Sequence, residues 1–214
     1  KELAYQLNVL GTKNMAEASR RVGAHLVYIS TDFIFDGTAG PYDEHGKPNP
    51  LSYYGNTKLE AEKIVQELTH WSILRTVLVI GIAEDLKRNN IVLWAKGALE
   101  KGQAINVVDD QFRTPTLAED LAQGALLAAT QKARGIYNIS GPDFMSIYEL
   151  VGHVAEHFGL SMDSVTKVDS TTLNQPAMRP PRTGLDITKA KTELGFKPHS
   201  FSEALEVIAE QAGL

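Results

Sequence analysis

Tyr54 and Lys58 are the residues of this sequence whose types and spacing first suggest acid–base chemistry. They stand four positions apart in YYGNTKLEAEK, residues 53–63, so on a helix their side chains lie on one face, one turn apart. A phenol has a pKa of about 10, and a nearby ammonium lowers that pKa by favouring the phenolate. The pair could then exchange a proton with a carbonyl or hydroxyl oxygen. The same spacing also arises by chance on an amphipathic helix, so the pair alone leaves both interpretations open.

A second hydroxyl, that of Thr31, follows the nearly continuous apolar run at residues 25–30. Such a run is typical of a strand that is buried on both faces of a parallel sheet. Ligands of these sheets bind outside the carboxyl ends of the strands. Thr31 and Asp32 are therefore expected at the crevice, although Ser30, Thr31 and Asp32 could instead form only a polar turn.

The elements that must position these residues alternate along the chain. The first part reads as a helix over 2–21, a strand over 25–30, a loop over 36–50, a helix over 52–68 and a strand over 72–82. This alternation predicts an α/β fold with a parallel, doubly wound, Rossmann-like sheet. Further helices are expected over 90–101, 117–131, 146–158, 188–194 and 201–212, and further strands over 104–108 and 135–140. Ser146 and Glu149 are expected to form a capping box at the start of the helix over 146–158. Residues 161–185 are expected to be mixed and rich in loops.

Composition excludes several classes of protein. Of the 214 residues, 43% are hydrophobic and 22% are charged, which is typical of a globular chain. The net charge of −5 and the lack of a basic tract argue against a nucleic-acid partner. Cysteine is absent, which excludes disulfides and thiolate chemistry and fits a cytoplasmic location. No apolar stretch is long enough to span a membrane.

The chain resembles the extended short-chain dehydrogenase/reductases, and within them the dTDP-4-dehydrorhamnose reductases and their relatives. The matching segments are 8–18, 29–37, 41–42, 49–62, 74–81, 110–122, 135–141 and 179–196. Matches in one order along most of the chain are far more specific than a Tyr-x-x-x-Lys pair. The resemblance implies reduction of a nucleotide-linked 4-keto sugar by NADP or NAD.

The resemblance also implies roles for individual residues. Tyr54 would donate the proton to the reduced carbonyl, and Lys58 would lower the pKa of Tyr54 and bind the nicotinamide ribose. Thr31 would hydrogen-bond the substrate oxygen with Asp32 beside it, and Ile29 would back the cofactor. The further substrate-binding residues implied in this way are Leu78, Gln111 and Arg113, with Thr114 in the same loop. Gln111, Arg113 and Thr114 could equally form a polar loop with one salt bridge.

Two residues differ from the usual pattern of the related reductases, and a third matches a position with a further role. Phe33 and Leu78 stand where related reductases often carry Tyr and Trp, which puts the identity of the sugar in doubt more than the type of reaction. Asn8 matches a position that can complete a proton relay through water, although it could equally be a helix residue that faces solvent.

The sequence contains only part of the dinucleotide-binding half of the expected fold. The sequence contains no G-x-G-x-x-G turn, which such a site needs for the pyrophosphate, and no residue that distinguishes NAD from NADP. On the family's plan two βα units and a strand, roughly 70 residues, should precede residue 1. Without them the sheet would carry an unpaired edge, open to pairing with another chain, so a homodimer is also expected.

The expected division of the chain has four segments. Residues 1–82 would be the C-terminal part of the Rossmann domain, 83–116 an insertion of the substrate region, 117–141 a return to the sheet and 142–214 the substrate-binding region. Two other functions stay open: an epimerase or dehydratase of the same superfamily, which Asp32 would suit, and a non-catalytic cofactor-binding subunit like the regulatory subunit of methionine adenosyltransferase.

One motif is expected to carry no function. His153, Glu156 and His157 match the H-x-x-E-H pattern of a zinc protease. Their helix should turn its apolar residues inward, which leaves these three side chains facing solvent. No third ligand follows in the sequence, and no metal site is expected.

Overall fold

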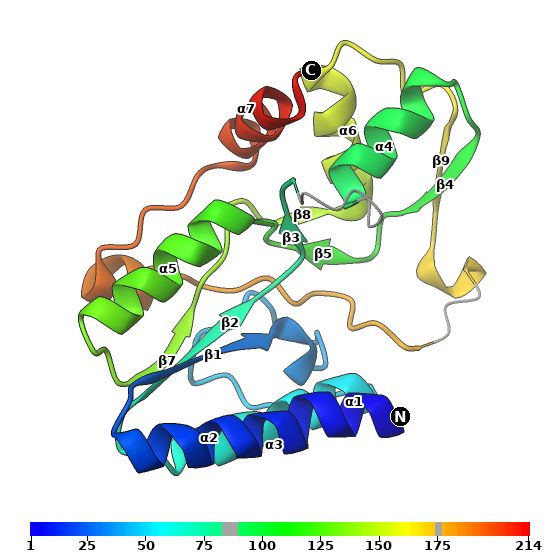
Figure 1. Ribbon diagram of the computed structural model, residues 1–214. Helices are drawn as coiled ribbons and strands as arrows, with labels where there is room; N and C mark the ends of the chain where they lie inside the picture. Colours follow the sequence, from blue (N-terminus) through cyan, green and yellow to red (C-terminus); the bar gives the residue numbers. More distant parts are fainter. Residues whose placement is uncertain (83–89, 174–176) are drawn as a thin grey trace.

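A parallel three-stranded sheet organises the part of the chain that carries Thr31 and Tyr54. The computed structural model describes residues 1–82, 90–173 and 177–214. In it, β1 (Leu26–Thr31), β2 (Trp71–Thr76) and β7 (Gly135–Asn138) lie in the order β1-β2-β7, as Figure 1 shows. Both pairings are parallel, and Thr31 lies opposite Thr76 at the carboxyl end of the sheet. The predicted parallel sheet is confirmed.

Helices cover both faces of this sheet, as a doubly wound fold requires. On one face α1 (Glu2–Tyr5), η1 (Gln6–Leu10) and α2 (Gly11–Val22) form a continuous rod beside α3 (Tyr53–Gln66). On the other face lies α5 (Ala118–Thr130) with the π-helical turn η4 (Ala190–Leu194). The core under α2 and α3 consists of Ala16, Val65, Leu68, Trp71 and Ile73. The core under α5 consists of Leu74, Ala128, Tyr137, Ile139, Ala190, Leu194 and Phe196.

A second, larger core belongs to the part of the fold that faces the carboxyl end of the sheet. It is built from α4 (Ile91–Glu100), α6 (Ile147–His157), α7 (Phe201–Ala212) and the parallel strands β4 (Ile105–Val108) and β9 (Val165–Val168). The capping box predicted at Ser146 and Glu149 is present at the start of α6. None of the described helices is long and apolar enough to cross a membrane.

Short elements connect the two parts. The strand β3 (Val79–Ile80) pairs with β6 (Thr116–Leu117), and β5 (Phe112–Arg113) pairs with β8 (Met145–Ser146). The 3-10 turns η2 (Asp32–Ile34) and η3 (Ser170–Thr172) follow β1 and β9. These connections bring the ends of β1 and β2 against the loop that contains Arg113.

The structure differs from the predicted elements in two places. The single strand predicted over 72–82 is broken, because Leu78 takes a left-handed backbone conformation with φ 41° between β2 and β3. The stretch predicted as mixed and loop-rich contains β9, which β4 stabilises through a parallel ladder. A distant partner strand of this kind leaves no local signal in the sequence.

The chain crosses between the two cores more often than the expected four segments imply. Residues 83–89 of the expected insertion lie outside the described residues. Ala190, Leu194 and Phe196 pack against the sheet, although they fall within the expected substrate-binding region 142–214. The helix α7 then returns to the second core. The four boundaries therefore stay a prediction.

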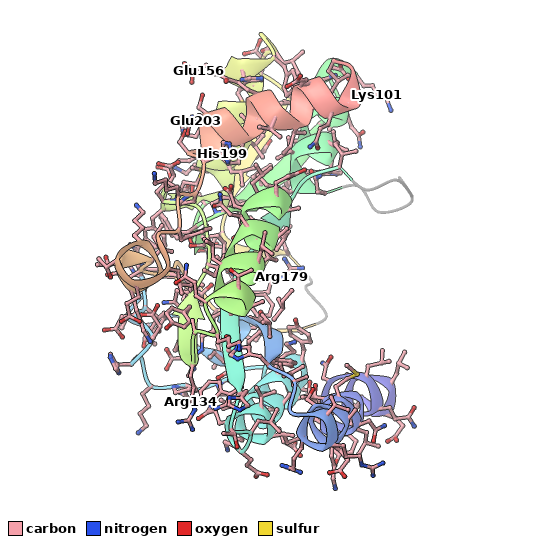
Figure 2. The ribbon with its side chains drawn as sticks, turned by 60° about the vertical axis from the view of Figure 1, so that its left-hand side comes forward. Lys101, Arg134, Glu156, Arg179, His199 and Glu203 are labelled. Carbon is pink, nitrogen blue, oxygen red and sulfur yellow. The ribbon has the colours of Figure 1, made fainter. Side chains whose placement is uncertain are left out.

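The H-x-x-E-H motif lies on α6, with His153 and Glu156 in the predicted orientation, whereas His157 is half-buried beside Phe158. Leu150, Val151 and Val154 are buried, whereas His153 and Glu156 are exposed, and Figure 2 shows Glu156 at the outer surface of the helix. The side chain of His153 lies 3.9 Å from that of Glu156. No group of three or more potential metal ligands occurs within the described ranges.

Candidate active site

A close approach of α3 to the loop after β1 brings Tyr54 beside Thr31. The helix begins after Ser52, whose hydroxyl accepts a hydrogen bond from the Gly55 N–H at 3.0 Å. A Cβ atom at Gly55 would lie 2.2 Å from the Phe33 carbonyl oxygen, so only glycine permits this approach. The rings of Phe33 and Tyr54 then meet edge to face, with their centroids 6.2 Å apart.

Tyr54 is exposed at this junction, with 44% of the residue accessible to solvent. Burial raises the pKa of Tyr54, and the negative charge of Asp32 raises it further, whereas a hydrogen bond with the Thr31 hydroxyl lowers it. Lys58 is not among the groups that shift this pKa. The expected lowering of the Tyr54 pKa by Lys58 stays a prediction.

Lys58 instead contacts β1. Its ammonium donates a hydrogen bond to the Ile29 carbonyl oxygen at 2.6 Å and lies 4.3 Å from the centroid of the Tyr28 ring. Burial lowers the pKa of Lys58 to about 8, and the nearby Glu62 carboxylate opposes that shift. Ile29 is 45% exposed on β1, an edge strand in this structure. Lys58 and Ile29 thus adjoin, as expected of residues that share one ligand.

Asp32 is buried at the end of β1 and is held from three sides. Its carboxylate accepts hydrogen bonds from the hydroxyls of Thr183, at 2.5 Å, and Thr31, at 3.1 Å. The Arg113 Nε atom lies 3.7 Å from Asp32 Oδ2. Burial raises the pKa of Asp32 to about 6, although Arg113 and the two hydroxyls favour the charged form. This carboxyl group can therefore exchange a proton close to neutral pH.

Arg113 is only 5% exposed, and its guanidinium forms hydrogen bonds within the protein. Its guanidinium donates to the carbonyl oxygens of Phe112 at 2.7 Å, Pro180 at 2.8 Å and Pro181 at 3.1 Å. These contacts tie the segment around residue 180 to the loop at 111–114. The predicted direct contact of Arg113 with a substrate stays a prediction.

A cavity of 310 Å³ gathers most of the predicted residues in one place. Its lining residues are Thr31, Asp32, Phe33, Tyr54, Leu78, Ile91, Val108, Gln111, Arg113, Ile147 and Arg179. Lys58 and Ile29 do not line this cavity. Thr114 is buried nearby, where its hydroxyl donates to Ser140 at 3.1 Å.

Several lining residues carry no functional signal in the sequence. Ile91, Val108 and Ile147 read as ordinary core positions of helices and strands. Arg179 is exposed, so it places a cation at the cavity, and its charge lowers the pKa of Arg113. Arg179 lies within one of the segments that match the family. It is far from the other site residues in the sequence, so its spacing gives no sign that it lines the cavity.

Asn8 connects the first helix to the same region and does not simply face solvent. Its side-chain amide donates to the Thr57 hydroxyl at 3.0 Å, and that hydroxyl donates to the Tyr54 carbonyl oxygen at 2.8 Å. Asn8 also lies in the π-helical turn η1, a feature often found at functional sites. The amide supports the position of α3, and a role in a proton relay stays a prediction.

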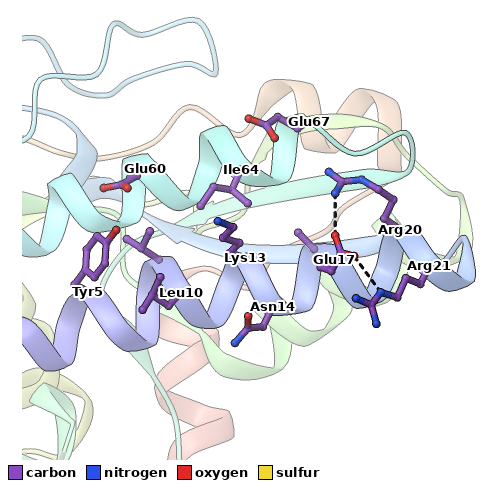
Figure 3. Close-up of a pocket in the computed structure, with 12 residues that line it drawn as sticks. Tyr5, Leu10, Lys13, Asn14, Glu17, Arg20, Arg21, Glu60, Ile64 and Glu67 are labelled. Carbon is purple, nitrogen blue, oxygen red and sulfur yellow. Dashed lines mark hydrogen bonds and ion pairs between the residues drawn. The ribbon is translucent and has the colours of Figure 1, made fainter.

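A larger cavity, of 520 Å³, lies between α2 and α3 (Figure 3). Half of its lining residues are charged, and Glu17 forms ion pairs with Arg20 and Arg21 at its edge. None of the predicted site residues lines it. Tyr54, Thr31 and Asp32 therefore belong to the smaller cavity at the carboxyl end of the sheet.

The fold and the site together define a class of protein. A parallel sheet covered on both faces, with a hydroxyl residue at a strand end and Tyr-x-x-x-Lys on the next helix, is the arrangement of a Rossmann-type dehydrogenase or reductase. The family model described as "RmlD substrate binding domain" matches residues 1–213. The chain belongs to this family, within the extended short-chain dehydrogenase/reductases.

Comparison with known proteins supports this assignment. A dTDP-4-dehydrorhamnose reductase from Clostridium acetobutylicum superposes with a TM-score of 0.91 and 32% identity, over 100% of this chain and 75% of that one. That from Bacillus anthracis, solved in complex with NADP, gives a TM-score of 0.90 and 30% identity, over 98% and 74% of the two chains. Methionine adenosyltransferase 2 subunit beta from Xenopus laevis is 34% identical over 165 residues. Those residues are 74% of this chain and 49% of that protein, so the chain spans about half the length of this curated relative.

Proposed function

We propose that the protein containing this chain reduces a nucleotide-linked 4-keto sugar with NADPH or NADH. The observation that carries the proposal is the meeting of Tyr54, Thr31 and Asp32 in one cavity, with Lys58 and Ile29 beside it. The similarity to two dTDP-4-dehydrorhamnose reductases, one of them bound to NADP, supports the same reaction.

The residues beside the cavity fit the nicotinamide end of such a cofactor. Ile29 offers an exposed apolar surface, Lys58 offers an ammonium with donors beyond the one given to Ile29, and Tyr54 offers a phenol at the edge of the cavity. These three residues would hold the cofactor. When bound, it supplies the hydride that reduces the keto carbon.

The hydroxyl groups then supply the proton. Tyr54 would protonate the carbonyl oxygen as negative charge develops on it, and Thr31 would hold that oxygen in place. The Thr31 hydroxyl lies within a hydrogen-bonded set, because it donates to Asp32 and accepts from the Phe33 N–H at 3.2 Å. Leu78, Gln111 and Arg113 would line the sugar and its linkage to the nucleotide.

The experiment compares two neighbouring tyrosines in the complete gene product. Tyr54→Phe removes the proposed proton donor, whereas Tyr53→Phe removes an equally exposed phenol that has no lysine four residues later. We expect Tyr54→Phe to lower the rate of NADPH oxidation with a dTDP-4-keto sugar by about 10²-fold or more, and Tyr53→Phe to leave it unchanged. Equal rates in the two variants would refute the assignment. Turnover of a sugar without net oxidation of NADPH would instead identify the epimerase or dehydratase.

The second candidate is a non-catalytic cofactor-binding subunit. The 34% identity to methionine adenosyltransferase 2 subunit beta favours it. A stable complex with a methionine adenosyltransferase, together with no turnover of any nucleotide sugar, would support this alternative over the reductase.

A further inference from the structure

We propose that Tyr28 is a positioning residue whose ring face holds the Lys58 ammonium against β1. The inference rests on the proposed role of Lys58 in binding the cofactor, and it adds a residue that does not itself line the cavity. Tyr28 would act through Lys58 and would not touch the reacting atoms.

The geometry fixes Lys58 at two points. Its ammonium lies 4.3 Å from the centroid of the Tyr28 ring and 2.6 Å from the Ile29 carbonyl oxygen. A cation within about 6 Å of an aromatic centroid is attracted by the negative face of the ring. Since both contacts come from consecutive residues of one strand, β1 determines where the ammonium lies relative to Ile29.

Tyr28 contacts the Lys58 ammonium through its ring face and not through its hydroxyl. The hydroxyl is buried and makes no hydrogen bond within the described ranges that meets normal geometry. The neighbouring Thr12 hydroxyl donates its proton to the Asn8 carbonyl oxygen at 2.7 Å, so that proton is not available to the Tyr28 hydroxyl. Burial raises the pKa of Tyr28 far above its ordinary value, so the phenol stays neutral and bears no charge that could pair with Lys58.

The ring is also held firmly in place. It packs against the core under α2 and α3, which contains Ala16, Val65 and Ile73. A ring fixed by packing from two helices presents its face to Lys58 without a further loss of side-chain entropy. The contact therefore orients the ammonium in advance of any ligand.

The Glu62 carboxylate does not replace this contact. Glu62 lies one turn further along α3 and favours the charged form of Lys58. Its two carboxylate oxygens, however, accept hydrogen bonds from Arg75 at 3.1 Å and 2.9 Å. Tyr54, one turn before Lys58, is not among the groups that shift the pKa of Lys58. Within the described ranges, the Tyr28 ring and the Ile29 carbonyl are the groups found in contact with the ammonium.

The test replaces the ring while leaving the proposed catalytic residues intact. In the complete gene product, Tyr28→Phe keeps the aromatic face and removes only the unpartnered hydroxyl, whereas Tyr28→Leu removes the face. The measurement is the pH dependence of NADPH binding, which reports the pKa of Lys58, alongside KM for NADPH and kcat.

We expect Tyr28→Leu to lower the pKa of Lys58 by about half a unit to one and a half units. At pH 8 this variant should bind NADPH more weakly, with a raised KM and a nearly unchanged kcat, and Tyr28→Phe should match the parent protein. If Tyr28→Leu does not fold, a fluorinated phenylalanine at position 28 keeps the shape of the ring and weakens its negative face, and it should produce the same shift.

Lys58→Met separates this inference from the proposed function. Unchanged NADPH binding in Lys58→Met would refute the role of Lys58 itself. If Lys58→Met weakens binding but neither Tyr28→Leu nor the fluorinated ring shifts the pH profile, Tyr28 contributes only to the core, and the inference about Tyr28 alone is overturned.

Discussion

Gly55 allows the sharpest test of how the site is assembled, because one methyl group there should displace Tyr54. An added Cβ would lie 2.2 Å from the Phe33 carbonyl oxygen and 2.9 Å from Pro50 Cβ. Protein Cβ atoms essentially never come closer than 3.0 Å to another heavy atom. The start of α3 must therefore move away from the loop after β1 by about 1 Å, since a backbone carbonyl cannot turn aside as a flexible side chain can.

Two consequences follow from a shift of that size. Overpacking of a well-packed contact costs about 1–3 kcal/mol of unfolding free energy, so Gly55→Ala should lower the urea midpoint. A displacement of about 1 Å at reacting groups lowers turnover by about 10²-fold, so kcat for the keto sugar should fall even at temperatures where the variant is fully folded.

Gly97→Ala is the matched control. Gly97 also lies within a helix, α4, but a Cβ there would meet no atom within 4 Å. Alanine is favoured over glycine in a helix by about 1 kcal/mol, so this variant should be as stable as the parent protein or more stable, with unchanged kcat. If Gly55→Ala behaves like Gly97→Ala in both urea unfolding and turnover, the close approach does not position Tyr54, and the reasoning fails.

Three further predictions concern buried polar groups. Glu62→Ala should cost about 3–5 kcal/mol in urea unfolding, because it leaves the buried guanidinium of Arg75, 3% exposed, without its carboxylate; a loss below 1 kcal/mol would contradict this. Ser30→Ala should preserve stability and kcat, since the buried Ser30 hydroxyl has no hydrogen-bond partner among the described residues, whereas Thr31→Ala should lower kcat; equal kcat in both would count against Thr31. Asp32 has a folded-state pKa of about 6, above its ordinary 3.8, so the folded state binds more protons and its contribution to stability falls as pH rises between these values. Asp32→Asn should remove that slope from unfolding measured across pH 4 to 6, and an unchanged slope would show that another group causes it.

Local patterns in the sequence were sufficient to predict most of the individual helices and strands. The alternation of helices with strands predicted the parallel sheet correctly. The apolar run before Thr31 also predicted a strand correctly, but this strand lies at the edge of the sheet, where Ile29 is 45% exposed and not buried. The start of α6 at Ser146 followed from its capping residues, which act within one helical turn. The solvent-facing side of α6 at His153 and Glu156 followed from helical periodicity alone.

The contacts within the site depended on the tertiary structure. Tyr54 and Lys58 share a helix face, yet Tyr54 meets Thr31 whereas Lys58 meets the Ile29 carbonyl and the Tyr28 ring. Helical spacing places two side chains on one side of a helix, but the neighbouring strand decides what each of them contacts.

Partners that are distant in sequence could not be found from local patterns at all. Thr183 holds Asp32 across 151 positions of the chain, and β9 exists because β4 supplies its ladder. Arg179 reaches the cavity only because the segment after it is tied to Arg113 through backbone carbonyls. Residue types and periodicity determine which groups are available and which elements carry them, whereas long-range hydrogen bonds and burial determine their environment and therefore their pKa values and chemistry.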